Sequence, residues 1–321
     1  MQGRLARVAV RRLALMVASL FVVSVVTFGA VNILPGDVAL TILGQQASES
    51  QLETLRRQLG LNRPLWVRYL DWVAGFLTGD LGASYYFSQS VRKLVVERFP
   101  KTTFLALSAI TIAVSLSIPL GIVAALRENE RVDLLASLTA FAGVSLPNFF
   151  WGIMLILVFA RYLNVFPPSG YVSPLADPVG AVAHVVLPAA ALAFGLMAHI
   201  MRMTRSSLLE ELRAGYVQLG RMKGMSDLSI VYRHALRNAF LPVLTVIGFQ
   251  LSYLFGGVVI IEQVFSYPGL GRLLFNSVLQ RDVPVIQTSV LIFAAITMTS
   301  NLVVDLLYAV FDPRIGSGEG V

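Results

Sequence analysis

Long apolar segments recur along this chain, and they constrain its fold more than any other feature. The first runs from Leu13 to Leu34 and holds no charged residue. A helix that crosses the hydrocarbon core of a bilayer needs about 20 consecutive apolar residues. Charged residues make up only 13% of the 321 residues, against about 25% in a typical soluble domain. The sequence therefore predicts a membrane protein rather than a soluble enzyme.

Six apolar segments predict an all-α polytopic membrane protein with six transmembrane helices, in a single domain covering residues 1–321. A helix satisfies all of its backbone hydrogen bonds within one segment, as the interior of a bilayer requires. The predicted spans are about Leu13–Leu34, Thr102–Leu126, Leu134–Leu163, His184–Thr204, Ala239–Phe265 and Ile286–Phe311.

The positions of Lys and Arg predict which side of the membrane each loop faces. Four arginines precede the first span, and seven Lys and Arg lie in residues 202–237. The short segments 161–183 and 266–285, on the other side, hold one and two. Positive residues concentrate in short cytoplasmic loops. We therefore expect both termini and residues 205–238 in the cytoplasm, with residues 35–101 outside it.

Residues 35–101 carry helix signals and predict an extracytoplasmic helical insert. Ser48 and Ser50 each precede a Gln or Glu by three residues, which is the spacing of a capping box, and Gly60 is a natural helix end. A second helix follows Pro64 and carries an aromatic-rich stripe. The stripe fits either a helix lying at the outer membrane interface or a platform for an external partner. Its residues are Trp66, Tyr69, Leu70, Val73, Phe76 and Leu77.

The segment 205–238 is polar and basic, which is unusual in this chain. Ser206–Met222 is predicted to form one helix, Gly224 permits a left-handed turn that ends it, and Ser226 is a favourable N-cap for a second helix. This arrangement predicts a helix–Gly turn–helix with an exposed apolar ridge and a basic flank. The ridge fits a groove on another protein, or the loop lies on anionic lipid. Its residues are Leu228, Val231, Tyr232 and Ala235.

The stretch from Tyr216 to Pro242 resembles the cytoplasmic coupling loop, or EAA loop, of ABC-importer permeases. More narrowly, it is similar to the dipeptide/oligopeptide/nickel permease family. Gly220 stands where that family has Ala, and Gln218 stands where the wider superfamily has Glu. The residues that match the first half of the motif are Tyr216, Val217, Arg221, Lys223 and Gly224. Those that match the second half are Arg233–Ala239 and Pro242.

Four further stretches look like the first permease subunit of peptide-type systems. They are LPGD (34–37), GLNRPLWVRYLDWVAGFLTGDLGASY (60–85), FSYPGLGRLLFNSVLQRDVPVIQ (265–287) and NLVVDLLYAVFDPRI (301–315). The resemblance implies a type I ABC-importer permease fold in a bacterial or archaeal plasma (inner) membrane. The implied function is that of a transmembrane permease subunit in an ATP-driven importer of di- or oligopeptides or related small solutes.

The resemblance also implies partners. These are a second homologous permease subunit, two ABC ATPase subunits, an extracytoplasmic substrate-binding protein and membrane lipid, with no nucleic acid. We expect the chain to be no enzyme and to hold no cofactor, because it lacks the G-x-x-x-x-G-K-[ST] loop that cradles nucleotide phosphates. ATP and Mg would be bound by the ATPase subunits. The residues implied to couple to them are Tyr216, Gln218, Gly220, Arg221, Lys223, Gly224, Ser226, Leu228, Tyr232, Arg233 and His234.

The stretch GVSLPNFFWG, residues 143–152, is a candidate hinge or pathway lining because it combines a proline, an amide and aromatic rings. Ionisable groups inside a membrane are often functional. Glu262 and Asp305 both lie near predicted helix ends, so structural pairing with an arginine is the alternative for them. The candidate pathway or hinge residues are Pro147, Asn148, Phe149 and Glu262.

Other classes of function fit the sequence less well. His184 and His199 would lie about 22 Å apart on one helix, too far to share a metal ion. A self-contained secondary transporter or channel is the alternative function, although the spans lack charged relay residues. A membrane enzyme would need a polar catalytic cluster that the sequence does not show. The resemblance leaves four solute classes open: peptides, nickel chelates, glutathione-like compounds and oligosaccharides.

Overall fold

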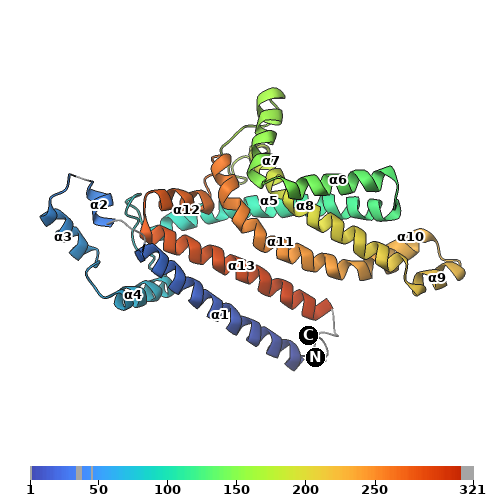
Figure 1. Cartoon of the computed structure of the whole chain (residues 1–321), viewed down its shortest axis with the longest axis horizontal. Helices are drawn as coiled ribbons and strands as arrows, with labels where there is room; N and C mark the ends of the chain where they lie inside the picture. The colour runs from blue at the N-terminus through green and yellow to red at the C-terminus, as the bar shows by residue number, and fades with distance from the viewer. Residues whose placement is uncertain (1, 34–37, 45, 312–321) are drawn as a thin grey trace. The chain divides into compact units, whose positions relative to one another are not determined.

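The computed structural model describes residues 2–33, 38–44 and 46–311, and the regular elements in this part of the chain are all helices, with no β-strand (Figure 1). Two π-helical segments, η1 and η2, interrupt the α-helices. The elements are α1 (Gln2–Ile33), α2 (Val38–Leu43), α3 (Glu49–Gln58), α4 (Leu65–Thr78), α5 (Val91–Leu126), α6 (Arg131–Ser145), α7 (Asn148–Leu155), η1 (Ile156–Tyr162), α8 (Pro178–Leu212), α9 (Gly215–Met222), α10 (Asp227–Ser229), η2 (Ile230–Ala235), α11 (Leu236–Val264), α12 (Leu270–Leu279) and α13 (Val283–Phe311).

Five helical stretches are long and apolar enough to cross a membrane. They coincide with five of the six predicted spans and extend most of them by several residues. Parts of two family-like stretches, residues 34–37 and 312–315, lie outside the described residues. The five stretches are Ala9–Ile33, Val91–Leu126, Pro178–Leu212, Asp227–Val264 and Val283–Leu306.

The third predicted span, Leu134–Leu163, is not one continuous helix. Helix α6 ends at Ser145, and Pro147 has an extended backbone with ψ 148°. Helix α7 then begins at Asn148 and continues into η1. Proline disfavours the helical conformation in the residue before it, which explains why the chain breaks here. The break lies at Pro147, within the stretch that the sequence indicated as a candidate hinge.

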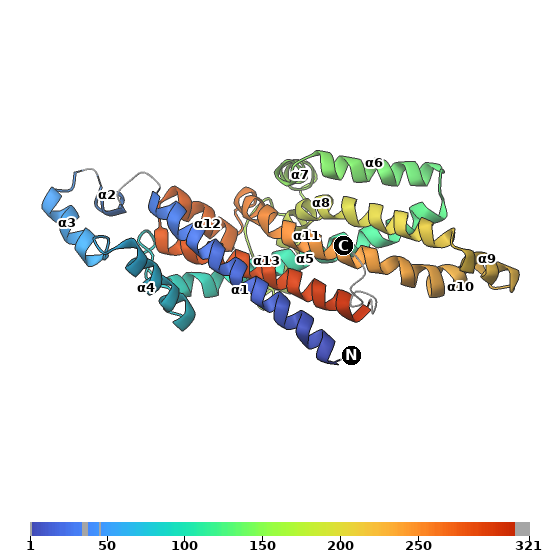
Figure 2. The same cartoon turned by 60° about the horizontal axis from the view of Figure 1, so that its bottom comes forward.

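The chain divides into two compact units, the first made of residues 1–13, 104–267 and 297–321. In this unit α8 packs against α6, α7 and α11, as Figures 1 and 2 show. Glycines allow these helices to approach closely, since a Cβ on Gly143 would lie 2.7 Å from the Phe194 carbonyl oxygen. Small residues serve this purpose in membrane helix packing generally. The contacts make α8 the central helix of the unit.

The second unit comprises residues 14–103 and 268–296. Here α4 packs on α1, because the Tyr69 and Trp72 rings contact Phe28, and the Tyr69 hydroxyl lies 2.7 Å from the Ser24 hydroxyl. Trp66 faces away and is exposed. The predicted aromatic stripe of α4 is therefore divided, with one part packed on α1 and another free to contact lipid or a partner.

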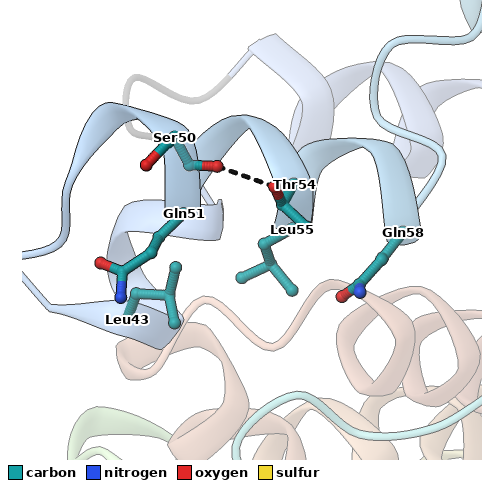
Figure 3. A pocket seen from close by; sticks show the side chains of 6 residues that line it. All are labelled: Leu43, Ser50, Gln51, Thr54, Leu55 and Gln58. Carbon is teal, nitrogen blue, oxygen red and sulfur yellow. Dashed lines mark hydrogen bonds between the residues drawn. The ribbon is translucent and has the colours of Figure 1, made fainter.

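Helix α3 begins as its sequence predicts. Ser48 is its N-cap and forms a complete capping box with Gln51, whereas the carbonyl of Ser50 accepts a hydrogen bond of 2.8 Å from the Thr54 hydroxyl. Figure 3 shows Gln51, Leu55 and Gln58 pointing to one side of α3, where they line a shallow groove with Leu43 of α2. The insert is thus an ordered helical structure in its described part.

A buried carboxylate joins two of the family-like stretches. Asp282 lies between α12 and α13 and is fully buried. It accepts hydrogen bonds from the Ser84 hydroxyl and from the backbone N–H groups of Tyr85 (3.1 Å) and Tyr86 (3.3 Å). Three donors satisfy this carboxylate within the second unit, so its burial is compatible with a stable fold. The GASY and QRDVP sequences therefore meet in space.

Candidate functional site

Segment 205–238 contains two short helical pieces that project beyond the end of α8. Helix α8 ends at Leu212, and Ala214 has an extended backbone with ψ 147° before α9 begins. The prediction of one helix over Ser206–Met222 was wrong. The turn allows Val217 and Gly220 of α9 to be buried against the following segment, which a straight continuation of α8 would not.

The predicted glycine turn at Gly224 is present. Its φ is +77°, in the left-handed region that glycine favours. The N–H of Gly224 donates to Arg221 O (3.0 Å), and the N–H of Met225 donates to Gly220 O (3.1 Å). These two bonds are the Schellman pattern that satisfies the last carbonyl groups of a helix. Ser226 then caps α10 by accepting from the Ser229 N–H at 3.4 Å.

The predicted apolar ridge is only partly correct. Val231 and Ala235 are buried, but Leu228 is 70% exposed and Tyr232 is 58% exposed. Residues 230–235 are π-helical, and the i→i+5 bonds of a π-helix change the angle between successive side chains. The 3.6-residue periodicity used for the prediction therefore fails here, and the four residues divide between a buried face and an exposed face.

The buried side chains of η2 and of the start of α11 pack against two long helices. Ala235 and Ala239 form one apolar cluster with Leu208 of α8 and with Ile122 and Ala125 of α5. A displacement of η2 would consequently act on both α5 and α8. A hollow of 270 Å³ lies between α9 and η2. Its lining residues are Tyr216, Val217, Leu219, Gly220, Lys223, Met225, Ile230 and His234.

Segment 205–238 also exposes large apolar side chains and basic ones. Arg221 pairs with Asp227 across the glycine turn at 3.1 Å. Gln218, Lys223, Arg233 and His234 are also exposed. Apolar groups gathered on a protruding turn are typical of a contact surface for another protein. We define the exposed apolar surface as Leu219, Met222, Leu228 and Tyr232.

Two ion pairs hold the base of the segment against the turn between α5 and α6. The Arg205 guanidinium donates to both Asp133 carboxylate oxygens, at 2.5 and 2.7 Å. The Asn129 N–H adds a third bond to Asp133, and Arg213 pairs with Glu128 at 2.6 Å. Sequence reasoning missed Asp133 and Glu128. Acidic residues in a short loop beside a basic segment were the signal that could have indicated them.

Tyr216 forms a second connection at the base. Its hydroxyl donates to the Glu211 carboxylate, and the Asn238 amide donates to Glu211 (3.3 Å) and to the Tyr216 oxygen (3.4 Å). The pKa of Tyr216 is raised to about 12. Desolvation by burial is the largest cause, and the hydrogen bond to Glu211 is the second. The hydroxyl is a donor at neutral pH and holds α9 to the end of α8 and to the first turn of α11.

We expect the Tyr216 phenol to ionise near pH 12 rather than near the ordinary value of about 10. Because the folded pKa is the higher one, the interaction stabilises the fold below about pH 10 and is lost as pH rises towards 12. The ultraviolet absorbance of tyrosinate, compared between the wild type and Tyr216→Phe, measures this titration. A difference spectrum that develops fully by pH 10 would refute the assignment.

Gly220, the departure from the family pattern, should tolerate alanine. A Cβ at this position would meet Met225 Sδ at 3.5 Å and Ile230 Cδ1 at 3.6 Å, which are ordinary contacts. Alanine is also better than glycine within a helix by roughly 0.5–1 kcal/mol. We expect Gly220→Ala to leave the thermal unfolding midpoint unchanged or slightly raised. A clear decrease would show that α9 packs more tightly against η2 than the structure indicates.

The candidate pathway residues fall in different environments. The Asn148 side chain lies between α8 and α11 and borders a groove, whereas Pro147 and Phe149 are exposed. Glu262 is fully buried in α11 and does not line that groove. Asp305 forms an ion pair of 2.9 Å with Arg12, as the structural alternative predicted. The structure does not gather the four candidates into one site.

Comparison with known proteins decides the family. The model of the family described as "Binding-protein-dependent transport system inner membrane component" matches residues 117–317, and the model of its N-terminal region matches residues 5–106. This chain belongs to that family. The permease is accordingly a multi-pass inner-membrane protein and a subunit of an ABC importer. The resemblance to peptide-type permeases is thereby confirmed.

Similar proteins cover nearly the whole permease. The dipeptide transport system permease protein DppB of Escherichia coli K12 is 38% identical over 329 residues, covering 95% of this chain and 97% of the relative. DppB of Alkalihalophilus pseudofirmus is 38% identical over 328 residues, covering 96% and 98%. A Brucella suis protein is 39% identical over 305 residues, covering 95% and 97%.

A solved structure supports the fold. It is an inward-facing conformation of the MetNI methionine ABC transporter, matched with a TM-score of 0.57 over 68% of this chain and 96% of that chain. The sequence identity is 17%, so the match concerns the fold alone. The predicted type I ABC-importer permease fold is confirmed by it and by the family.

Proposed function

We propose that this permease forms half of the translocation pathway of an ABC importer for dipeptides or oligopeptides. The relatives named as dipeptide transport permeases support this solute class. A second homologous permease subunit would supply the other half. An extracytoplasmic binding protein would deliver the peptide, and its contact surface would include residues 35–101. Two ATPase subunits would bind ATP and Mg, so the permease itself would carry out no hydrolysis.

The observation that carries the proposal is the Schellman turn at Gly224, which presents the exposed apolar surface of Leu219, Met222, Leu228 and Tyr232. An exposed apolar surface carried by short helices fits a groove on a partner protein. The concentration of Lys and Arg in residues 202–237 supports a cytoplasmic location, where ATPase subunits reside. Both termini would be on the same side. We assign this surface to the ATPase contact.

The packing suggests how movement would be transmitted. When the ATPase subunits close, they would push on α9 and η2. The cluster of Ala235 and Ala239 would pass this displacement to α5 and α8, while the Asp133–Arg205 pair holds α6 to α8. Rigid-body rotation of helices about a break such as the one at Pro147 is a common form of alternating access. The residues proposed for coupling are those expected from the sequence, with Leu219 and Met222 added.

Reconstitution tests the proposal against the alternative of a self-contained transporter. The permease is placed in liposomes either alone or with its partner permease, ATPase subunits and binding protein. We expect dipeptide uptake only in the complete assembly, only with ATP, and faster with peptide-loaded binding protein. Gradient-driven uptake by the permease alone would favour a secondary transporter. ATP hydrolysis stimulated by a nickel chelate or an oligosaccharide, but by no peptide, would reject the solute class.

A further inference from the structure

A groove of 590 Å³ lies between α7, α8 and α11 within the first unit. Three of its lining residues carry polar side chains with amide or imidazole groups, namely Asn148, His199 and Gln250. The remainder are apolar, apart from the hydroxyl group of Tyr253. The lining residues are Asn148, Leu192, Gly195, Leu196, His199, Val246, Phe249, Gln250, Tyr253 and Leu254.

Two glycines form a slot for the Asn148 amide. A Cβ on Gly195 of α8 would lie 3.0 Å from Asn148 Oδ1, and a Cβ on Gly257 of α11 would lie 2.8 Å from Asn148 Nδ2. Any larger residue at Gly257 would therefore displace the amide. Asn148 is also the first residue of α7, directly after the break at Pro147. Its position is thus set by three helices at once.

The polar groups of the groove have hydrogen-bonding capacity that the described chain does not use. Gln250 and Asn148 both line the groove, and neither amide is among the described buried polar groups that lack a partner, so both amides are accessible from the groove. His199 Nδ1 lies 3.1 Å from Gly195 O, so in the neutral ring Nδ1 donates and Nε2 is left as an acceptor. These groups can therefore form hydrogen bonds with a molecule that enters the groove.

The chemistry of the lining indicates the class of partner. It contains no Asp, Glu, Lys or Arg, so it offers no ion pair to any charged group of a solute, and the charged termini of a peptide would have to lie outside the groove. Two primary amides and one imidazole acceptor can pair with both the N–H and the C=O of a peptide bond. Phe249 and Tyr253 are largely exposed and provide apolar surface for side chains. Such a lining recognises a peptide backbone while tolerating different side chains.

We infer that Asn148, His199 and Gln250 form a transient binding site for the backbone amide groups of the peptide during its passage. This inference rests on the proposed function and adds the place where the permease contacts its solute. Neutral hydrogen bonds without an ion pair hold a solute weakly, which suits a site that must release it. A lipid chain or the second permease subunit in this groove is the competing occupant.

The test measures dipeptide uptake and stimulated ATP hydrolysis together in the reconstituted importer. Gln250→Leu keeps the size of the side chain and removes its amide. We expect uptake to fall about tenfold, equivalent to about 1.4 kcal/mol, while stimulated ATP hydrolysis stays within about twofold, since the coupling surface is untouched. Gln280→Leu, the same change at an exposed position outside the groove, should leave both rates unchanged.

A modified solute identifies what the groove recognises. A dipeptide with an N-methylated peptide bond lacks the backbone N–H, so the wild type should carry it more slowly than the normal dipeptide. The Gln250→Leu and His199→Phe variants should discriminate between the two less than the wild type does. Equal uptake by wild type and Gln250→Leu would overturn the inference. If the variants no longer assemble with the second permease subunit, the groove is a contact between the two subunits and the inference is overturned.

A wrong solute class and a wrong assignment of the groove give different results in these measurements. If the wild-type assembly takes up no peptide at all, the solute class is wrong and the site assignment falls with it. If the wild type imports dipeptides and Gln250→Leu imports them equally well, the proposed function stands and only the assignment of the groove is rejected.

Discussion

Replacing Gly224 by valine should abolish the stimulation of ATP hydrolysis by peptide-loaded binding protein. The residue has a φ of +77° and closes the Schellman turn between α9 and α10. A side chain with a Cβ costs roughly 1–2 kcal/mol in this conformation, and β-branched residues tolerate it least. Valine would change the angle between α9 and η2 and disrupt the exposed apolar surface. Steady-state ATP hydrolysis in the reconstituted importer measures the effect.

Two further variants distinguish an effect of the turn geometry at Gly224 from a general disturbance of segment 205–238. Gly215→Val introduces the same side chain at an exposed glycine of α9 where no positive φ is required and no atom lies within 4 Å of the new Cβ. It should retain most of the stimulation. Gly224→Asn should recover part of it, because asparagine visits the left-handed region more readily than other residues. Normal coupling in Gly224→Val would mean that the turn geometry is irrelevant to ATPase contact.

The Asp133→Asn variant should lose about 3 kcal/mol of unfolding free energy. Asp133 is buried, and its two hydrogen bonds to the Arg205 guanidinium join α6 to α8. Removing one partner of a buried ion pair typically costs about 3–5 kcal/mol, since the remaining charge stays desolvated. Because Arg205 is partly exposed, we expect the loss of unfolding free energy to lie at the low end of this range. Denaturant titration in detergent, followed by tryptophan fluorescence, gives the value.

A surface ion pair provides the matched control. Asp71 lies 2.6 Å from Arg63, but both side chains are more than half exposed. Exposed pairs contribute about 0–1 kcal/mol, so Asp71→Asn should be nearly neutral. Asp133→Leu combined with Arg205→Met removes both charges and should recover most of the stability. A neutral Asp133→Asn would show that the hairpin is held by apolar contacts alone.

The helical fold could be read from the sequence because a membrane span needs a long apolar run. The runs beginning at Leu13, Thr102, His184, Ala239 and Ile286 all begin within helices. The division of the third span at Pro147 was harder to predict, since transmembrane helices tolerate proline when neighbouring groups satisfy the backbone. Whether a given proline kinks a helix or ends it depends on tertiary packing.

The candidate site was predictable where the signal is local. The turn at Gly224 and the cap at Ser226 follow from the conformational freedom of glycine and the short side chain of serine. The π-helical segment 230–235 has no comparable local signal, so the division of Leu228 and Tyr232 from Val231 was missed. The contacts of Asp133 with Arg205, and of Asn148 with Gly195 and Gly257, join distant parts of the chain. Periodicity along one helix cannot reveal them.

Cross-linking from Leu228 tests the central claim most directly. The chain has no cysteine, so Leu228→Cys provides one thiol at an exposed apolar position of segment 205–238. A short photoactivatable reagent attached to this thiol reports the nearest protein in the assembled importer. The ATPase subunit should be the cross-linked partner, and the yield should change when nucleotide is added. Reaction of the thiol with a membrane-impermeant reagent from outside intact cells, or no cross-link to the ATPase in the full assembly, would contradict the proposed coupling role.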